Sequence, residues 1–272
     1  HYDHLSFLIK SRRFDSEGAI GKLAAHVIQG QATQSWQLLE SSMNTEANQL
    51  TLADTDLKTW LAPLVNQYYQ GIAQCSEIEQ AFTLLAKFRV LCVTRQGELG
   101  VDALNQWIRE RLIHRDDCSQ TNYHGMPIMI SENDYWLGLF NGDIGLLWRS
   151  DNGHLMAYFE STDQTGICDK KHEEEQVQAE GLAKDKSYKI LPPSRLPKYD
   201  AVYAMTIHKT QGSEFEHVAI VLPKQAEHQL LSRELLYTGI TRAKTKITIA
   251  SNKQTWQFSV KTAINRYSGL VL

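Results

Sequence analysis

Hydrophobic positions near the start of the chain follow the period of a helix. Between residues 20 and 28 apolar side chains recur at intervals of three and four, which predicts a core-facing helix that Ser16 caps and Gly30 ends. The predicted stripe consists of Ile20, Leu23, Ala24, Val27 and Ile28. Residues 31–76 carry weaker patterns between polar clusters, so only helices joined by loops are predicted there.

The next segment predicts a helix, a buried strand and another helix. Spaced apolar residues indicate helices at 78–86 and 101–112, and the apolar run at 89–94 indicates a buried strand between them. A turn is expected at 97–100, which begins and ends with glycine. The first of these helices is expected to bury Ile78, Phe82, Leu85 and Ala86.

From about residue 121 the pattern changes to short strands. Apolar runs at 126–130, 144–148 and 154–159 predict three of them. The Asp-Asn-Gly sequence at 151–153 predicts a hairpin between the last two, because Asn and Gly tolerate positive φ. This segment therefore reads as a small β insertion.

After the insertion the α/β pattern resumes. Residues 163–187 are charged and poor in large apolar groups, so a mobile hairpin tip or a disordered loop is expected there. A strand at 218–222, a helix at 233–243 and a strand at 246–250 follow. Segments on both sides of the insertion must then share one sheet.

This organisation predicts an α/β fold in two domains. The larger, discontinuous domain is expected at 1–120 and 199–272, and the inserted β domain at 121–198. The 272 residues, 42% of them apolar, are enough for such a core, and no apolar run approaches the roughly 18 residues that cross a bilayer. We therefore expect a cytoplasmic protein without a membrane segment.

The net charge and the cysteine spacing argue against some kinds of binding site. The net charge of −3 argues against strong independent binding to duplex DNA, which needs an excess of Lys and Arg. No two of the four cysteines have Cys-x-x-Cys spacing, so free thiols are expected rather than a zinc site or disulfides. The acidic run at 169–175 is interpreted as a solvated charge run, and no metal ligand is predicted.

Two motifs near the C-terminus carry the strongest chemical signal. Residues 204–215 read Ala-Met-Thr-Ile-His-Lys-Thr-Gln-Gly-Ser-Glu-Phe, and residues 236–244 read Leu-Tyr-Thr-Gly-Ile-Thr-Arg-Ala-Lys. Further matching blocks lie at 8–16, 91–105 and 125–145. In this order the blocks resemble the motifs of superfamily 1 helicases and, among these, the RecD family.

The resemblance implies a fold and a function. It implies a RecA-like second motor domain, a parallel sheet flanked by helices, with an inserted SH3-like β-barrel. It implies an ATP-dependent 5′ to 3′ DNA helicase that acts in double-strand-break repair and homologous recombination. ATP and Mg²⁺ would be the cofactors of the whole protein, single-stranded DNA its substrate, and RecB and RecC its partner subunits.

A P-loop is missing from the sequence. Its Gly-x-x-x-x-Gly-Lys-Ser/Thr string lets backbone N–H groups and a lysine surround the phosphates. The nearest string has Ser16 in place of the first glycine and Leu23 in place of the hydroxyl. An Asp-Glu pair at the end of an apolar strand is also lacking. We therefore expect this chain to be the C-terminal portion of a longer helicase and to be inactive alone.

Four residues are expected at the nucleotide by resemblance. Arg242 and Arg13 match the arginines of motifs VI and IV that contact the γ-phosphate, where a guanidinium stabilises charge in the transition state. Arg242 is expected on the helix that follows the strand at 218–222. Glu214 matches an acid near the nucleotide sugar, and Gly212 permits close backbone approach. An ion pair for Arg242 and a turn-capping carboxylate for Glu214 are the structural alternatives.

DNA contacts are expected from five other residues. Thr206, His208 and Gln211 lie in the motif at 204–215, and Thr94 and Asn105 match positions where family members contact the DNA backbone. A core-packing role for His208 is the alternative.

Tyr135 has two interpretations. The first places it among the turns and core of a small barrel, with Asn141 and Gly142 forming a tight turn. The second has Tyr135 and Trp136 stack on the bases of a DNA strand.

Two other functions are kept open. The first is a stand-alone RecD-like helicase, which a surface for RecB and RecC would distinguish from the subunit. The second is a non-catalytic module that binds single strands or a partner through the β insertion. DNA binding that survives deletion of residues 121–198 would count against the second.

Overall fold

The structure of this chain is a computed structural model that describes residues 18–42, 49–54, 56–113, 122–150, 152–161, 187–210, 212–225 and 227–264. Contacts within the chain divide it into two units. The first contains residues 1–75, 80–118 and 203–272, and the second contains residues 76–79 and 119–202. The second unit is thus an insertion in the sequence of the first.

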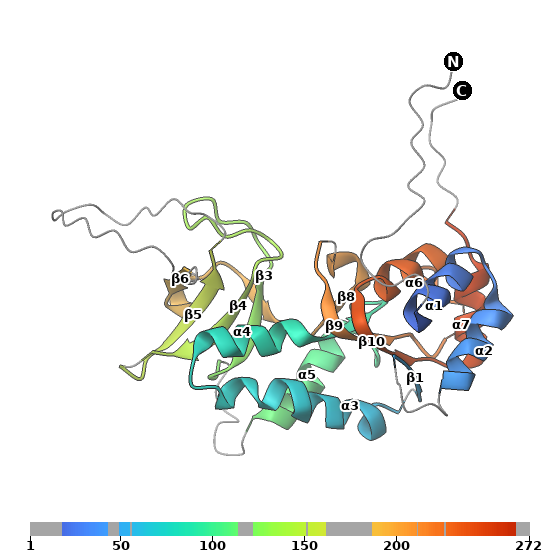
Figure 1. Ribbon diagram of the computed structural model, residues 1–272. Helices are drawn as coiled ribbons and strands as arrows, with labels where there is room; N and C mark the ends of the chain where they lie inside the picture. The colour runs from blue at the N-terminus through green and yellow to red at the C-terminus, as the bar shows by residue number, and fades with distance from the viewer. Residues whose placement is uncertain are drawn as a thin grey trace, which may run out of the picture. The chain divides into compact units, whose positions relative to one another are not determined.

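A parallel β-sheet forms the centre of the first unit (Figure 1). Its strands are β1 (Leu50–Ala53), β2 (Phe88–Cys92), β8 (Ala204–Thr206), β9 (Phe215–Val221) and β10 (Ala243–Ala250), in the order β1-β10-β9-β2-β8. Every neighbouring pair is parallel. Because β2 lies between β8 and β9, segments from both sides of the insertion share one sheet. The expected parallel α/β architecture is confirmed.

Helices cover both faces of this sheet. They are α1 (Ala19–Ile28), α2 (Ala32–Ser42), α3 (Leu57–Val65), α4 (Ile78–Lys87), α5 (Val101–Leu112), α6 (Arg233–Ile240) and α7 (Lys253–Lys261), with the single turns η1 (Asn66–Gln70) and η2 (Ile72–Gln74). Gly239 of α6 lies against Ile220 of β9, α1 and α7 pack against α6, and α2 packs against α1 and α7 (Figure 1). His217 is three residues from Ile220 in β9, so it points to the opposite face, where it meets η1.

Local sequence signals account for several of these elements. Ser232 and Asn252 cap α6 and α7, because their side chains accept hydrogen bonds from Leu235 N–H and Thr255 N–H. Gly239 has no side chain, and a Cβ there would lie 2.9 Å from Ile220 Cδ1. Glycine therefore allows α6 to approach the sheet closely.

The first predicted helix is present but differs in detail. α1 ends at Ile28 and is followed by Gly30 with a φ of 75°, as expected for a helix stop. Ile28 itself is exposed rather than buried, because it lies at the edge of the apolar stripe. Ser16, the expected cap, lies outside the described residues. The helix begins after Gly18, which has no side chain and therefore makes no side-chain capping bond.

Other sequence predictions needed correction. Ala86 of α4 is exposed, and Ala81 is buried in its place. The helix predicted at 233–243 ends at Ile240, because β10 already begins at Ala243. The strands β1 and β8 were not predicted. Each has only three or four residues, too few to display a period.

The second unit contains an antiparallel sheet. Its strands are β3 (Met126–Ile130), β4 (Ile144–Arg149), β5 (Leu155–Glu160), β6 (Tyr188–Leu191) and β7 (Tyr199–Ala201), in the order β6-β5-β4-β3-β7, with the turn η4 (Pro193–Arg195) before β7. The three predicted strands and the hairpin between β4 and β5 are confirmed. The segment 163–187, expected to be a loop, lies almost entirely outside the described residues.

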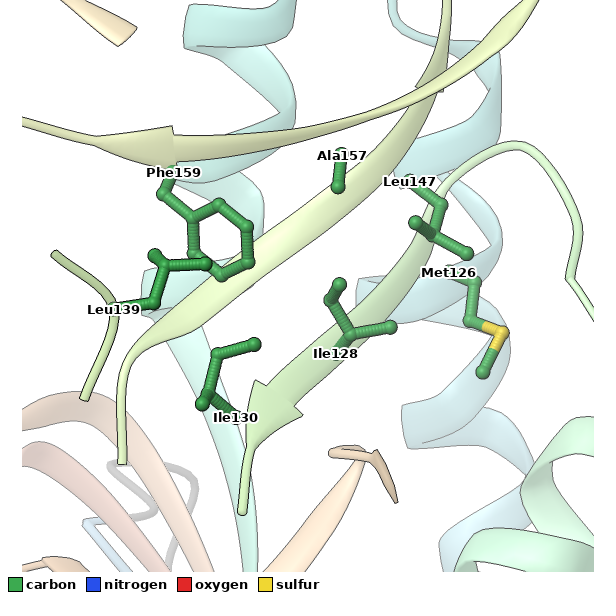
Figure 2. Close-up of a cluster of buried hydrophobic side chains, with 7 residues drawn as sticks. All are labelled: Met126, Ile128, Ile130, Leu139, Leu147, Ala157 and Phe159. Carbon is green, nitrogen blue, oxygen red and sulfur yellow. The ribbon is translucent and has the colours of Figure 1, made fainter. Parts of the chain in front are cut away.

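This sheet has its own hydrophobic core (Figure 2). The cluster consists of Met126, Ile128, Ile130, Leu139, Leu147, Ala157 and Phe159. The residues come from β3, β4, β5 and the loop before β4, at alternating strand positions that share one face. Within the described residues, β6 and β7 each pair with a single strand, so the pairs form an open sheet of five strands.

Two further expectations concern cysteines and membranes. Cys75 and Cys92 are free thiols, as predicted, while Cys118 and Cys168 lie outside the described residues. Among the helices that the structure describes, none has the length and apolar content to span a bilayer.

Candidate functional site

The motif at 204–215 joins two edges of the parallel sheet. Thr206 ends β8 beside Cys92 of β2, whose other neighbour is Val221 of β9, so Thr206 lies at the carboxyl edge. Residues 207–214 then return to the start of β9, which lies at the amino edge. Since β9 is seven residues long, the two edges are separated by roughly 20 Å. We call residues 207–214 the connecting segment.

The connecting segment begins with a helical turn. η5 (Ile207–Thr210) buries Ile207 and Thr210, and the Thr210 hydroxyl donates to the Ile207 carbonyl at 2.6 Å. His208 and Lys209 are exposed, so His208 does not pack in the core. Thr206 is partly exposed directly before this turn. Gln211 lies outside the described residues.

Gly212 gives the connecting segment its bend. Its φ of 89° lies in the left-handed region, where a side chain would be strained. A Cβ built at this position would meet no atom within 4 Å. The backbone at Gly212 is therefore open to approach, and its contact with a nucleotide stays a prediction.

Arg242 is not on a helix, which corrects the sequence prediction. It lies in the turn between α6 and β10, because α6 ends two residues earlier. Its side chain is only 7% exposed. The guanidinium Nε donates to the carbonyl of Thr238 at 3.1 Å, and Nη1 donates to the carbonyl of Ser213 at 3.3 Å. The guanidinium is therefore held against the connecting segment.

The backbone reinforces this link. The Phe215 N–H donates to the Arg242 carbonyl at 2.9 Å, and Arg242 Nη1 also approaches the carbonyl of Thr210 at 3.5 Å. Both ends of the arginine thus contact the stretch from Thr210 to Phe215. A displacement of the connecting segment would therefore shift Arg242, and a displacement of Arg242 would shift the connecting segment.

Glu214 and Lys244 form an ion pair at the same edge. Lys244 Nζ lies 3.6 Å from Glu214 Oε2, and both side chains are partly exposed. Glu214 precedes β9 and Lys244 is the second residue of β10, so both lie with Arg242 at the amino edge. The structure therefore places Arg242, Glu214 and Lys244 at the same edge of the sheet, and the role of Arg242 and Glu214 at a nucleotide stays a prediction. Arg13 lies outside the described residues.

Thr94 follows β2 at the carboxyl edge, where Thr206 ends β8. Because Cys92 pairs with Thr206, Thr94 lies near the DNA-contact candidates of the motif. The Thr94 hydroxyl donates to the Gln96 carbonyl at 2.9 Å within the loop. Asn105 on α5 has its amide bonded to the backbone of Ala204. Sequence reasoning missed this bond, since the two residues are 99 positions apart.

Tyr135 and Trp136 belong to the second unit and point into solvent. Tyr135 lies in a turn, as the first interpretation expected, but Tyr135 is 76% exposed and Trp136 101% exposed, so Tyr135 is not part of a core. Tyr135 packs edge-on against Phe140, with ring centroids 5.9 Å apart. The expected turn at Asn141 and Gly142 is present, with a φ of 103° at Gly142.

The loop that carries these aromatic residues is held by hydrogen bonds. Asp134 Oδ1 accepts from the N–H groups of Trp136 and Leu137 at 3.0 and 2.9 Å. Lys189 Nζ donates to the carbonyls of Leu137 and Gly138 at 2.6 and 3.0 Å. The loop therefore presents its exposed rings from a fixed backbone.

The described part of the chain contains no group of three or more His, Cys, Asp or Glu side chains placed to hold a metal ion. The acidic run at 169–175 lies outside it, so the interpretation of that run stays a prediction.

This chain is similar to a helicase domain model, to a RecD subunit of the RecBCD enzyme and to a RecD2 helicase. Residues 201–250 match the model of the UvrD-like helicase C-terminal domain. The RecBCD enzyme subunit RecD of Haemophilus influenzae is 32% identical over 98% of this chain and 40% of that protein. The ATP-dependent RecD2 DNA helicase of Deinococcus radiodurans is 26% identical over 63% of this chain and 21% of that protein.

Among solved structures, the crystal structure of a Pif1 helicase from Bacteroides in complex with ADP-AlF3 and ssDNA covers 97% of this chain and 55% of that chain, with 16% identity and a TM-score of 0.46. The chain spans about 40% of the length of the RecD subunit it matches.

Proposed function

Because this chain belongs to the RecD family of DNA helicases, we propose that it supplies the C-terminal motor domain of an ATP-dependent DNA helicase. The whole protein would be the RecD subunit of RecBCD, move 5′ to 3′ on single-stranded DNA and act in double-strand-break repair and homologous recombination. RecB and RecC are its proposed partner subunits. The relatives' names and the motif resemblance support this proposal.

One observation carries the proposed mechanism. The connecting segment joins Thr206 at the carboxyl edge of the sheet to Glu214 and Arg242 at the amino edge. DNA bound near Thr206, His208, Gln211 and Thr94 would therefore be linked to a nucleotide near Arg242 through a single stretch of backbone. Such a link lets a change at one ligand bias the position of the other.

ATP with Mg²⁺ supplies the free energy when it is bound by the rest of the protein. The residues of this chain fit a role at its phosphates, because a guanidinium remains charged and donates several hydrogen bonds in one plane. Arg242, with Arg13, would stabilise the charge that develops on the γ-phosphate. Arg242 would exchange the carbonyl of Ser213 for a phosphate oxygen, while Glu214 and Gly212 would lie near the nucleotide.

The domain organisation belongs to the same proposal. We assign residues 1–120 and 199–272 to the RecA-like motor domain and residues 121–198 to the insertion. The five antiparallel strands of the insertion would curl into an SH3-like barrel. Support comes from the order β6-β5-β4-β3-β7, in which each strand except β7 pairs with a neighbour in the chain.

Stacking on Tyr135 and Trp136 is the proposed contribution of the insertion. Exposed rings on a fixed loop suit bases of a single strand, and stacking contributes about 1 to 3 kcal/mol per base. Replacing either ring with alanine in the full-length protein should weaken binding of single-stranded DNA about 5- to 150-fold. Fluorescence anisotropy with a labelled oligothymidylate measures this.

Tyr135→Phe is the matched control for this prediction. It keeps the ring and removes only the hydroxyl, so affinity should stay within about twofold. Unchanged affinity in both alanine variants would contradict the proposal that Tyr135 and Trp136 of the insertion bind single-stranded DNA.

ATPase measurements on two proteins test the function. The full-length protein should hydrolyse ATP and be stimulated by single-stranded DNA, whereas this chain alone should show no ATPase or unwinding, because its sequence has no P-loop. A full-length protein without DNA-stimulated ATPase would contradict the proposal. Measurable hydrolysis by the purified chain would contradict the proposal that the rest of the protein binds the ATP phosphates.

Purification with tagged RecB and RecC separates the subunit from the stand-alone helicase. A RecD subunit should elute with both partners from a size-exclusion column. A protein that elutes alone but still unwinds DNA would be the stand-alone helicase.

A further inference from the structure

The side chain of Asn105 on α5 bonds the outer edge of β8. In the described sheet, β8 is an edge strand whose strand neighbour is β2. Asn105 Nδ2 donates to the Ala204 carbonyl at 3.0 Å, and Asn105 Oδ1 accepts from the Ala204 N–H at 2.7 Å. The amide therefore makes the two hydrogen bonds that a further strand would make.

Buried backbone explains why these bonds matter. Ala204 is only 1% exposed, and a buried N–H or C=O group without a partner is unfavourable. The carbonyl of the preceding residue, Tyr203, accepts from Val90 N–H and from the Tyr69 hydroxyl. Consecutive residues of a strand direct their backbone groups to opposite sides, so those of Ala204 point away from β2 and towards α5.

The bonded position lies directly before the proposed DNA contacts. Ala204 is two residues before Thr206, the last residue before the connecting segment, and β8 has only three residues to hold Thr206 in place. β2 holds one side of this short strand and Asn105 holds the other. Loss of the amide would remove the two hydrogen bonds that Asn105 makes to β8 and leave its pairing with β2.

We infer that Asn105 is a positioning residue, whose amide holds β8 so that Thr206 and His208 meet the DNA backbone in a fixed geometry. This inference rests on the proposed function and revises the prediction that Asn105 itself contacts DNA. Both polar atoms of the amide are bonded to Ala204, so the residue acts through β8.

Hydrogen exchange tests the clamp without any activity measurement. In the full-length protein, Asn105→Ala should make the amides of residues 203–206 exchange about tenfold faster or more, because two hydrogen bonds at a sheet edge are lost. Gln106→Ala is the matched control, because Gln106 is next to Asn105 but its side chain donates to Glu110 of the same helix at 2.8 Å. It should leave the exchange of residues 203–206 unchanged. Equal exchange in the wild type and Asn105→Ala would overturn the inference.

Steady-state ATPase tests the consequence for DNA. Asn105→Ala should raise the oligothymidylate concentration for half-maximal stimulation about tenfold, while the half-saturating ATP concentration stays within about twofold. Asn105→Asp retains the acceptor for the Ala204 N–H but places a carboxylate oxygen against the Ala204 carbonyl, so its effect should be at least as large as that of Asn105→Ala. Either variant serves if the other does not fold. A parallel rise of both concentrations would indicate a general structural defect and overturn the inference.

A double variant separates positioning from direct contact. If Asn105 acts through β8, Asn105→Ala and Thr206→Val together should weaken DNA stimulation by less than the product of their separate effects. Fully multiplicative effects would mean an independent DNA contact and would overturn the inference. If the wild-type protein lacks DNA stimulation, the proposed function fails, and the hydrogen-exchange result still decides the clamp.

Discussion

Replacing Arg242 with alanine in the full-length protein should lower ATP turnover about 10³- to 10⁵-fold, the range expected for an arginine that stabilises the transition state of phosphoryl transfer. The guanidinium lies at the amino edge of the sheet, bonded to the carbonyls of Thr238 and Ser213. Alanine removes its charge and all of its donors. Steady-state and single-turnover ATPase, with saturating ATP and DNA, measure the effect.

Two further variants separate chemistry from folding. Arg242→Lys keeps the charge but loses the planar set of donors, so most of the turnover should still be lost. Arg111→Ala is a control, because Arg111 is exposed, donates to Asn66 Oδ1 at 3.1 Å and lies outside the matching motif blocks. Thermal unfolding of each variant shows whether the fold survives. Near-normal turnover in a folded Arg242→Ala protein would make Arg242 a structural residue.

Acid should destabilise the first unit through His217. Burial, with a smaller effect from Lys246, lowers the pKa of His217 from 6.5 to about 4. Its ring contacts Phe88 and Tyr68, and its Nε2 lies 2.9 Å from the Thr248 hydroxyl. A cationic imidazole is disfavoured there, whereas the unfolded chain binds the proton readily.

The sign of the effect follows from this difference. Above pH 6.5 the histidine is neutral in both states, and its full contribution to stability is present. As the pH falls from 6.5 to about 4, the unfolded state takes up the proton first, so the free energy of unfolding decreases by roughly 3 kcal/mol. Urea unfolding of this chain, followed by circular dichroism across that range, measures the decrease.

His217→Gln is the matched control for the acid effect. Its amide can still bond to Thr248 but does not titrate, so the curve of stability against pH should be flatter by roughly 3 kcal/mol over the same interval. Carboxylates that titrate in this range act equally on both proteins and cancel in the comparison. Curves of equal slope would show that His217 does not titrate differently in the folded and unfolded chain.

Elements with a long or strong pattern were predictable from the sequence. The run before Thr94 gave β2, and the spacing around Leu104 and Ile108 gave α5, because each pattern is contained within one segment. The Asp-Asn-Gly turn gave the β4–β5 hairpin for the same reason. Short strands such as β1 and β6 were not predicted, because their pairing depends on neighbours far along the chain.

The candidate site was only partly predictable. Motif resemblance selected Arg242, Glu214 and Thr206, and their roles stay predictions. The burial of Arg242 and its bonds to the connecting segment could not be predicted, since they depend on where α6 ends. The exposure of Tyr135 and Trp136 was also unpredictable. A large aromatic residue in a turn-rich segment fits a core as well as a surface, and the hydrogen bonds of Asp134 decide between them.

The sequence by itself determined the elements with a strong hydrophobic pattern and the motif residues that are candidates for ligand contact, because hydrophobic period and turn chemistry act over a few neighbouring residues. Only the tertiary structure decided that the connecting segment joins opposite edges of one sheet and that Asn105 closes β8. Those relations bring together residues from distant parts of the chain. Strand order, register and the burial of each polar group fix them, and no local pattern contains that information.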